Sequence, residues 1–158
     1  DLAQGLTRSI GVSNFHQQHL RRLLDETEVV PAVNQIEVHP FFQRADYQQL
    51  MGEHGVQIEA WGPFAEGRNG FFTNGTLRTI GEKYGKTVAQ TALRFLIQRG
   101  IVVIPKSTHA ERMAENFDVF DFELSAEDMH SIAVLDRKES LFLSHYDPET
   151  VEYLINYE

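Results

Sequence analysis

The chain contains no cysteine, which excludes disulfide bonds and catalysis by a thiolate. It also lacks any run of the roughly 18 apolar residues that a membrane-spanning helix needs. The first residues, DLAQG, are polar and no apolar segment follows them, so we expect no secretory signal peptide. Together these absences favour a cytoplasmic protein that does not insert into a membrane.

Positive charge is also scarce. The 158 residues include 14 Lys and Arg against 23 Asp and Glu, which gives a formal net charge of −9. A negative overall field disfavours nonspecific binding of nucleic acid, so any anionic ligand must be held by a local basic cluster. The histidines show no H-E-x-x-H pattern and no recurring ligand spacing, so we expect no metal site.

Strand-like and helix-like segments alternate along the chain. The hydrophobic periodicity predicts strands over 10–13, 32–39, 56–61 and 101–104, and helices over 17–26, 45–54, 77–84, 88–98, 109–116, 126–135 and 149–155. The Gly- and Asn-rich stretch 67–75 predicts a surface loop. Four strand-helix units in succession predict an α/β fold built on a parallel sheet.

Two architectures fit this alternation: an open doubly wound sheet and part of a (β/α)8 barrel. The first strand lacks G-x-G-x-x-G, the usual dinucleotide fingerprint. Gln35 and Glu37 alternate with Ile36 and Val38, whereas a strand buried on both faces is usually apolar throughout. Polar residues near strand ends fit a barrel, whose active site lies at that end. A full barrel needs eight units and roughly 250 residues, so the chain is either half a barrel or its units are undercounted.

The stretch IPKSTHAERMAEN at 104–116 gathers basic residues around a strand-to-helix corner. Thr108 and Glu111 match a capping box, which predicts that the helix starts at Thr108. A helix N-terminus offers free N–H groups and partial positive charge to an anion. Lys106 precedes this turn, and Arg112 lies one turn inside, where a guanidinium can grip a phosphate through two hydrogen bonds. The alternative interpretation is that both side chains are simply solvated.

Polar residues also follow the other predicted strands. They are Ser13 and Asn14, Gln35, and the Trp61-Gly62-Pro63 segment. Because the carboxyl ends of parallel strands meet at one edge, these side chains and the Lys106-Ser107 corner are predicted to lie on one rim. Amides pair with a carboxamide, an indole stacks on a ring and a lysine holds a phosphate, so the set suits a flat, amide-bearing, anionic ligand.

Two further groups of residues are interpreted as structural. Glu37 and Glu59 are either a catalytic pair or a polar layer of the core, and we favour the second because no partner acid or base can be placed. Phe117, Phe120 and Phe122 are predicted to be core aromatics.

Five segments, in this order along the chain, carry a family likeness. They are IGVSNF (10–15), NQIEVHP (34–40), AWGPFAEGRNGFF (60–72), GKTVAQTALRFLIQRGIVVIPKS (85–107) and ERMAENFDVFDFELSAEDM (111–129). The chain resembles the aldo-keto reductases, most closely the bacterial 2,5-diketo-gluconate reductase-like branch. The resemblance implies a (β/α)8 TIM barrel that uses NADPH, written NADP(H) for either redox state, without a Rossmann domain.

The resemblance also assigns cofactor roles to matching residues. It implies that Ser13, Asn14 and Gln35 hold the nicotinamide carboxamide and that Trp61 stacks on the nicotinamide ring. It implies that Gly62, Pro63 and Phe64 line the path of the pyrophosphate, with the 67–75 loop closing over the cofactor. The adenosine end is then assigned to residues at the corner described above, with Lys106, Ser107 and Arg112 on the 2′-phosphate, Thr108 beside them, and Glu115 and Asn116 at the adenine.

The catalytic tetrad of this family consists of Asp, Tyr, Lys and His on the first four strands, which precede the segment that IGVSNF matches. We therefore assign no catalytic residue and expect residues 1–158 to form one C-terminal half-barrel, strands five to eight with extra helices. Residues 136–158 are expected to be its C-terminal loop. The intact enzyme is expected to reduce a small carbonyl substrate, and the alternative is a cofactor-binding or inert fragment. Either the missing N-terminal half or self-association is expected to cover the open sheet edges.

Overall fold

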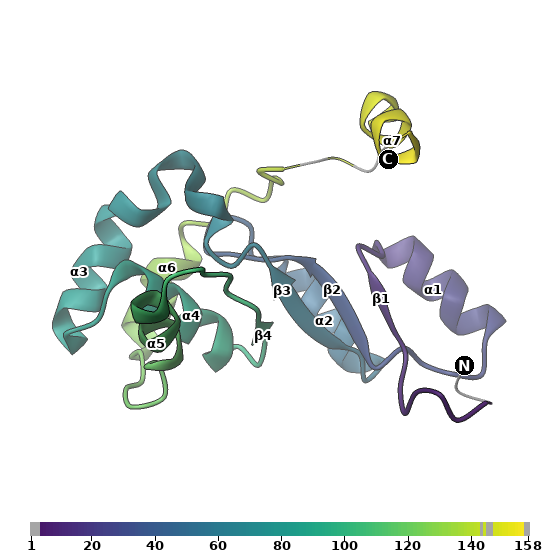
Figure 1. Ribbon diagram of the computed structural model, residues 1–158, viewed down its shortest axis with the longest axis horizontal. Helices are drawn as coiled ribbons and strands as arrows, with labels where there is room; N and C mark the ends of the chain where they lie inside the picture. Colours follow the sequence, from purple (N-terminus) through teal and green to yellow (C-terminus); the bar gives the residue numbers. More distant parts are fainter. Residues whose placement is uncertain (1–3, 143, 145–146, 157–158) are drawn as a thin grey trace.

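A computed structural model describes residues 4–142, 144 and 147–156 of the protein. Its centre is a four-stranded sheet in the order β1-β2-β3-β4, with every neighbouring pair parallel (Figure 1). The strands are β1 (Gly11–Ser13), β2 (Val33–Glu37), β3 (Gln57–Trp61) and β4 (Val102–Val103). The predicted strands and their parallel arrangement are confirmed, although β4 is shorter than expected.

The helices follow the strands as predicted. They are α1 (Gln17–Glu26), α2 (Ala45–Glu53), α3 (Gly75–Tyr84), α4 (Val88–Gln98), α5 (Ala110–Phe117), α6 (Ala126–Ala133) and α7 (Pro148–Ile155), with the 3-10 segment η1 (Ala65–Thr73) after β3. Local chemistry accounts for several boundaries. The sequence pattern of Thr87 and Gln90 predicts a capping box, and these residues form one at the start of α4. The Ser125 side chain accepts a hydrogen bond from the Asp128 N–H at the start of α6.

The two faces of the sheet are buried to different extents. Ile36, Ile58 and Ala60 point to one face and are buried in the core, together with residues such as Leu20 of α1 and Met51 of α2. On the other face, Gln35 and Glu59 are only partly buried. Figure 1 shows α2 behind β2 and β3, on the covered side. Among the described residues no helix covers the opposite face, which we call the open face, and residues 140–142 cover only its end at Glu37.

Both edges of the sheet are unpaired within the part of the chain that the structure describes, since β1 pairs with β2 and β4 pairs with β3. Apolar side chains are exposed in the segments beside each edge. Near β1 they are Leu6, Ile10, Val29 and Val30, and near β4 they are Val102, Ile104, Met113, Phe117 and Phe120. The prediction of three core aromatics is therefore wrong for Phe117 (78% exposed) and Phe120 (64% exposed). Phe122 is partly buried and packs against the core.

Candidate functional site

The ends of β1, β2 and β3 bring together the polar residues that the sequence placed on one rim. Register pairs Ser13 with Gln35, and Gln35 with Glu59. The Ser13 hydroxyl donates to the Gln35 carbonyl oxygen at 3.2 Å, and the Trp61 indole N–H donates to the Asn14 amide oxygen at 2.8 Å. Asn14 has a φ of 55°, a left-handed conformation that asparagine tolerates better than most residues. The rim is therefore a connected group of hydroxyl, amide and indole.

Glu59 is the partner of Gln35 on this rim, because the Gln35 amide nitrogen donates to its carboxylate. That contact agrees with a polar layer rather than a catalytic pair. Asn14 and Trp61 also line a cavity of about 880 Å³, together with Phe42, Ser140 and Phe142 at its other walls.

The segment after β3 is more ordered than the predicted surface loop. Residues 65–73 form η1, which is interrupted by residues with positive φ such as Glu66 and Asn69. Phe71 is fully buried in the core, so the loop prediction is wrong for this part of 67–75. Three of its glycine and asparagine residues, Gly67, Asn69 and Gly70, have positive φ, a conformation that these residue types tolerate. No local sequence pattern indicated that Phe71 would be buried.

The corner between β4 and α5 lines a second cavity, of about 720 Å³, which we call the corner pocket. Of the residues predicted to bind the cofactor, it contains Phe64, Lys106, Ser107, Thr108, Arg112, Glu115 and Asn116. It also contains Phe72, from the 67–75 segment that was expected to close over the cofactor, and four residues that the sequence did not indicate, namely Thr87, Val88, Ala89 and His109. Thr87 was recognised only as a helix cap. Nothing local in the sequence indicates that the start of α4 faces the β4–α5 corner.

Helix α5 does not begin as predicted. Its N-cap is His109, which makes no side-chain cap, so the Thr108–Glu111 capping box is wrong. Instead, the Ser107 hydroxyl oxygen accepts a hydrogen bond from the His109 N–H at 3.1 Å. The Ser107 side chain, and not that of Thr108, therefore bonds to the backbone here, and the helix begins after His109. The start of α5 still borders the corner pocket, because Ser107, Thr108 and His109 line it.

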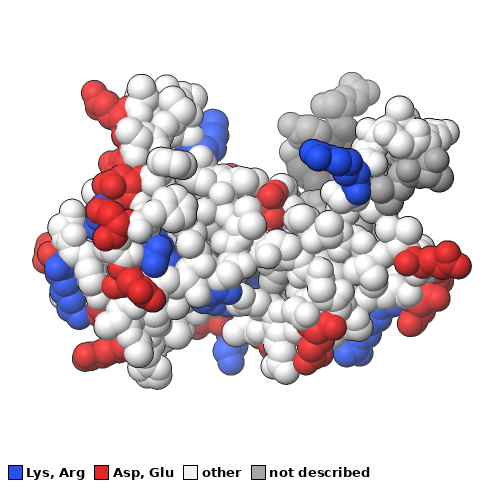
Figure 2. Space-filling model, turned by 90° about the horizontal axis from the view of Figure 1, so that it is seen from below, with Lys and Arg blue, Asp and Glu red and all other residues white. Residues whose placement is uncertain are grey.

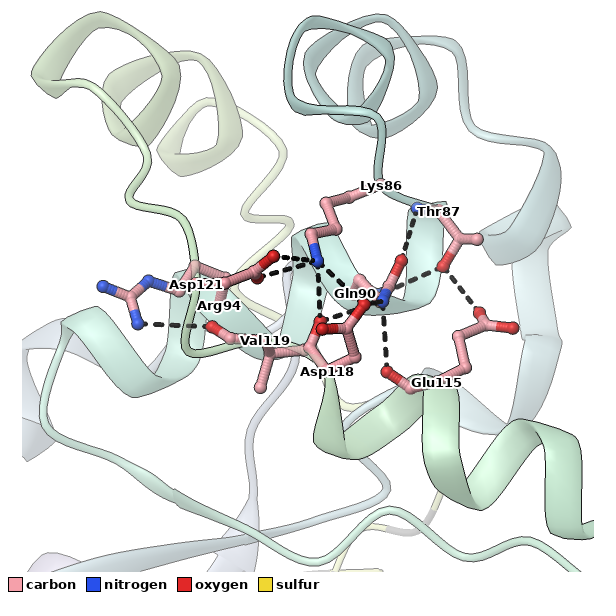
Figure 3. Close-up of polar contacts among 8 residues, drawn as sticks. All are labelled: Lys86, Thr87, Gln90, Arg94, Glu115, Asp118, Val119 and Asp121. Carbon is pink, nitrogen blue, oxygen red and sulfur yellow. Dashed lines mark hydrogen bonds and ion pairs between the residues drawn. The ribbon is translucent and has the colours of Figure 1, made fainter.

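The basic residues of the corner pocket are unpaired. Within the described residues, the side chains of Lys106 and Arg112 make no hydrogen bond and no ion pair. Lys86, beside the other end of α5, is saturated: its ammonium lies 2.9 Å from an Asp118 carboxylate oxygen and 2.7 Å from one of Asp121 (Figure 3). Hydrogen bonds to Asp118 and Asp121 raise the pKa of Lys86. Although acidic residues are in excess, these two cations of one pocket have no partner in the part of the chain that the structure describes.

The charged side chains of described residues that are visible on one face of the molecule form no basic tract (Figure 2). On the face drawn in Figure 2, acidic and basic side chains are scattered among uncharged surface, and no continuous basic tract is visible among the described residues. The described residues also contain no group of His, Cys, Asp and Glu arranged to hold a metal ion. No helix in the described ranges is both long and apolar enough to cross a membrane.

Comparison with known proteins agrees with this architecture. The Aldo/keto reductase family profile matches residues 2–137. Methylglyoxal reductase DkgA of Escherichia coli K12 is 46% identical over 138 residues, which are 87% of this chain and 50% of that protein. An aldo-keto reductase of Mycolicibacterium smegmatis is 46% identical over 150 residues, 95% of this chain and 53% of its own length. The chain therefore spans about half the length of the curated relatives it matches.

Solved structures share the fold. Apo Gox0644 superposes with a TM-score of 0.85 at 43% identity, covering 90% of this chain and 52% of that one. Aldo-keto reductase AKR2E5 of the silkworm Bombyx mori, crystallised with NADPH, gives a TM-score of 0.82 at 40% identity, covering 87% of this chain and 45% of that one. The four strand-helix units thus correspond to part of a (β/α)8 barrel.

Proposed function

The chain belongs to the aldo/keto reductase family, and from this premise we propose that it carries the NADPH-binding half of an enzyme that reduces small aldehydes and ketones. The corner pocket is the observation that carries this proposal. Lys106 and Arg112, which have no partner within the described ranges, lie beside the start of α5 in a cavity of about 720 Å³. An anionic group bound there would supply the charge partner that these two cations lack among the described residues.

We propose that the predicted residues are distributed along the length of NADPH. In this proposal Lys106, Ser107 and Arg112 hold the 2′-phosphate, with Thr108 beside it, while Glu115 and Asn116 contact the adenine. At the other end of the cofactor, the Asn14 and Gln35 amides and the Ser13 hydroxyl hold the carboxamide, and Trp61 stacks on the nicotinamide. Gly62, Pro63 and Phe64 join the two ends, and Phe64 lines the corner pocket.

NADPH, when bound, supplies the hydride that reduces the carbonyl carbon. The residues of this chain orient the nicotinamide and exclude water from it. We assign no proton donor among them. The Tyr84 hydroxyl donates a hydrogen bond to Asp128 at 2.6 Å, and the Tyr47 hydroxyl donates one to the carbonyl oxygen of Phe15. Both hydroxyl groups are therefore already used in structural hydrogen bonds. Tyr146 and Tyr157 lie outside the described residues. The proposal is that the chain alone binds cofactor without turnover.

A second half-barrel completes the proposed enzyme. Unpaired strand edges and exposed apolar side chains favour association with another chain segment. The described part of this chain has both, beside the open face of its sheet. The candidate occupants are the N-terminal half of the same protein and a second copy of this chain. We expect sedimentation of the purified chain to give an associated species. A stable monomer of 158 residues would contradict this part of the proposal.

The test of the cofactor role is a titration of the chain with NADPH, followed by the fluorescence of the reduced nicotinamide. Saturable binding is expected, with no steady-state reduction of a small carbonyl. Methylglyoxal is a suitable probe, because the Escherichia coli relative is named for its reduction. Absence of binding would reject the proposal in favour of an inert fragment. Turnover by the chain alone would show that it contains a proton donor that we have not assigned.

A further inference from the structure

Glu37 is a buried carboxylate that ties the C-terminal segment to the sheet. It ends β2 and is only 5% exposed. Its carboxylate oxygens accept hydrogen bonds from the Ser140 hydroxyl at 2.5 Å and from the Leu141 N–H at 2.9 Å. One of the same oxygens lies 3.0 Å from His39 Nε2. Burial opposes the charge of Glu37, but the bonds from His39, Ser140 and Leu141 outweigh it, so its pKa is lowered and the carboxylate is ionised near neutral pH.

The anchored segment reaches the nicotinamide end of the proposed site. Phe142 lies edge-on to Trp61, with ring centroids 5.0 Å apart and planes at 72°. A Cβ added at Gly62 would lie 3.5 Å from the same Phe142 ring, so the ring also closes against the backbone after β3. Edge-to-face pairing of this kind restricts the orientation of both rings. Trp61 is therefore held by Phe142 on one side and by its hydrogen bond to Asn14 on the other.

The same segment also holds η1. Arg68, on η1, donates a hydrogen bond to the Leu141 carbonyl oxygen at 2.5 Å. Its guanidinium lies 4.3 Å from the centroid of the Phe142 ring, within the range of a cation–π contact. Residues 140–142 thus connect the end of β2, the indole of Trp61 and the segment expected to close over the cofactor.

We propose that Glu37 is a positioning residue of the cofactor site. By fixing residues 140–142 it sets Phe142 against Trp61 and anchors Arg68, so that the stacking indole and the covering segment are in place before the cofactor binds. The inference rests on the proposed function for the role of Trp61, but the geometry that carries it involves residues of this chain alone. Preorganisation of this kind lowers the cost of ordering a site on binding.

Asp128 offers a matched comparison within the same chain. It is 2% exposed and its carboxylate contacts Lys83, Tyr84 and Ser125. Those partners join α3 to α6, and none of them contacts Trp61 or lines the corner pocket. Loss of Asp128 should loosen the fold as loss of Glu37 does, without reaching the site. Any effect specific to positioning must therefore appear for Glu37 and be absent for Asp128.

The experiment uses the fluorescence of Trp61, which is the sole tryptophan of the chain. In the full chain without cofactor, Glu37→Gln is expected to shift the emission to longer wavelength and to increase quenching by acrylamide, because the indole loses its Phe142 cover. The NADPH dissociation constant is expected to rise about fivefold. Phe142→Leu should reproduce the emission change, and combining it with Glu37→Gln should add little, since both break the same contact.

The control Asp128→Asn should lower the unfolding midpoint and leave the Trp61 emission unchanged. Ser140→Ala removes one of the two anchoring bonds and should give a smaller change of the same sign, which keeps the test available if Glu37→Gln does not fold. Wild-type emission in a folded Glu37→Gln or Ser140→Ala variant would overturn the proposal, as would an equal shift in Asp128→Asn. Wild-type chain that fails to bind NADPH would reject the proposed function, while the emission arm would still decide whether Glu37 positions Trp61.

Discussion

The basic side chains near the two ends of helix α5 differ in whether the structure shows ion-pair partners for them. At its C-terminal end, Lys86 is held by Asp118 and Asp121, and the same cluster includes Gln90, whose amide donates to the carbonyl oxygens of Glu115 and Asp118 (Figure 3). At its N-terminal end, Lys106 and Arg112 border the corner pocket without a described partner. In the first region the cation is neutralised by carboxylates of the chain, and in the second the described residues supply no such carboxylate. We call these the closed end and the open end of α5.

The difference separates a structural cation from one that is available to a ligand. Lys86 joins the turn before α4 to the segment after α5, so its charge is used to hold the fold together. Lys106 and Arg112 make no such link to any described residue. In a chain with 23 acidic and 14 basic residues, carboxylate partners are plentiful. The absence of a described partner at the pocket is therefore the feature that indicates an anion from outside the chain.

The largest expected effect is at the open end. Arg112→Ala should weaken NADPH binding about 10- to 100-fold, the range for a lost hydrogen bond to a charged group, and weaken NADH binding less than about twofold. The selectivity follows because NADH lacks the 2′-phosphate. Fluorescence titration with both cofactors measures it, and Arg78→Ala, which removes an exposed arginine of α3 outside the pocket, is the control. Equal losses for both cofactors would mean that Arg112 does not grip the phosphate.

The next effect is at the closed end. Gln90→Met should lower the free energy of unfolding by about 1–2 kcal/mol, because it leaves backbone carbonyl groups of Glu115 and Asp118 without their amide donor. Urea denaturation measures this loss. The preference for NADPH over NADH should persist, since Lys106 and Arg112 remain. The exposed variant Gln49→Met should stay within about 0.5 kcal/mol of wild type. A changed cofactor preference in Gln90→Met would show that the two ends are not independent.

The smallest effect concerns a single carboxylate of the closed cluster. The hydrogen bond from Lys86 lowers the pKa of Asp121 below its ordinary value of 3.8. Because the folded pKa is the lower one, the stabilisation is present above pH 3.8 and is lost as the pH falls through the lowered value. Carboxyl NMR titration should show this pKa returning toward 3.8 in Lys86→Met and staying low in Lys106→Met. A low pKa that survives Lys86→Met would assign the shift to another group.

Much of the fold was predictable because its signals are local. The Thr87–Gln90 capping box marked the start of α4, and the spacing of Leu20 and its neighbours marked α1. Alternation of strands and helices predicted the parallel sheet. The start of α5 was mispredicted because Ser107 and Thr108 offer competing hydroxyl groups, and the backbone turn through Ser107 prevailed. Apolar character wrongly placed Phe117 in the core, since exposure depends on which elements are present to cover it.

The candidate site divides in the same way. The basic corner at Lys106 and Arg112 was visible as a short motif, and the rim followed from parallel strands ending at one edge. The anchor at Glu37 was not visible, because it joins residues 103 positions apart. The sequence indicated that Glu37 belongs, with Glu59, to a polar layer of the core, and it showed Ser140 only as part of a polar tail.

By itself, the sequence determined the order of elements, the parallel sheet and the chemical character of the corner pocket, because periodicity, helix caps and strand-end residues act over a few positions. Only the tertiary structure decided which cations are already paired, which apolar side chains stay uncovered and how the C-terminal segment reaches Trp61. Those outcomes depend on packing between distant segments. Pairing a charge or covering a ring requires groups to meet within a few ångströms, and spacing along the chain alone does not specify such contacts.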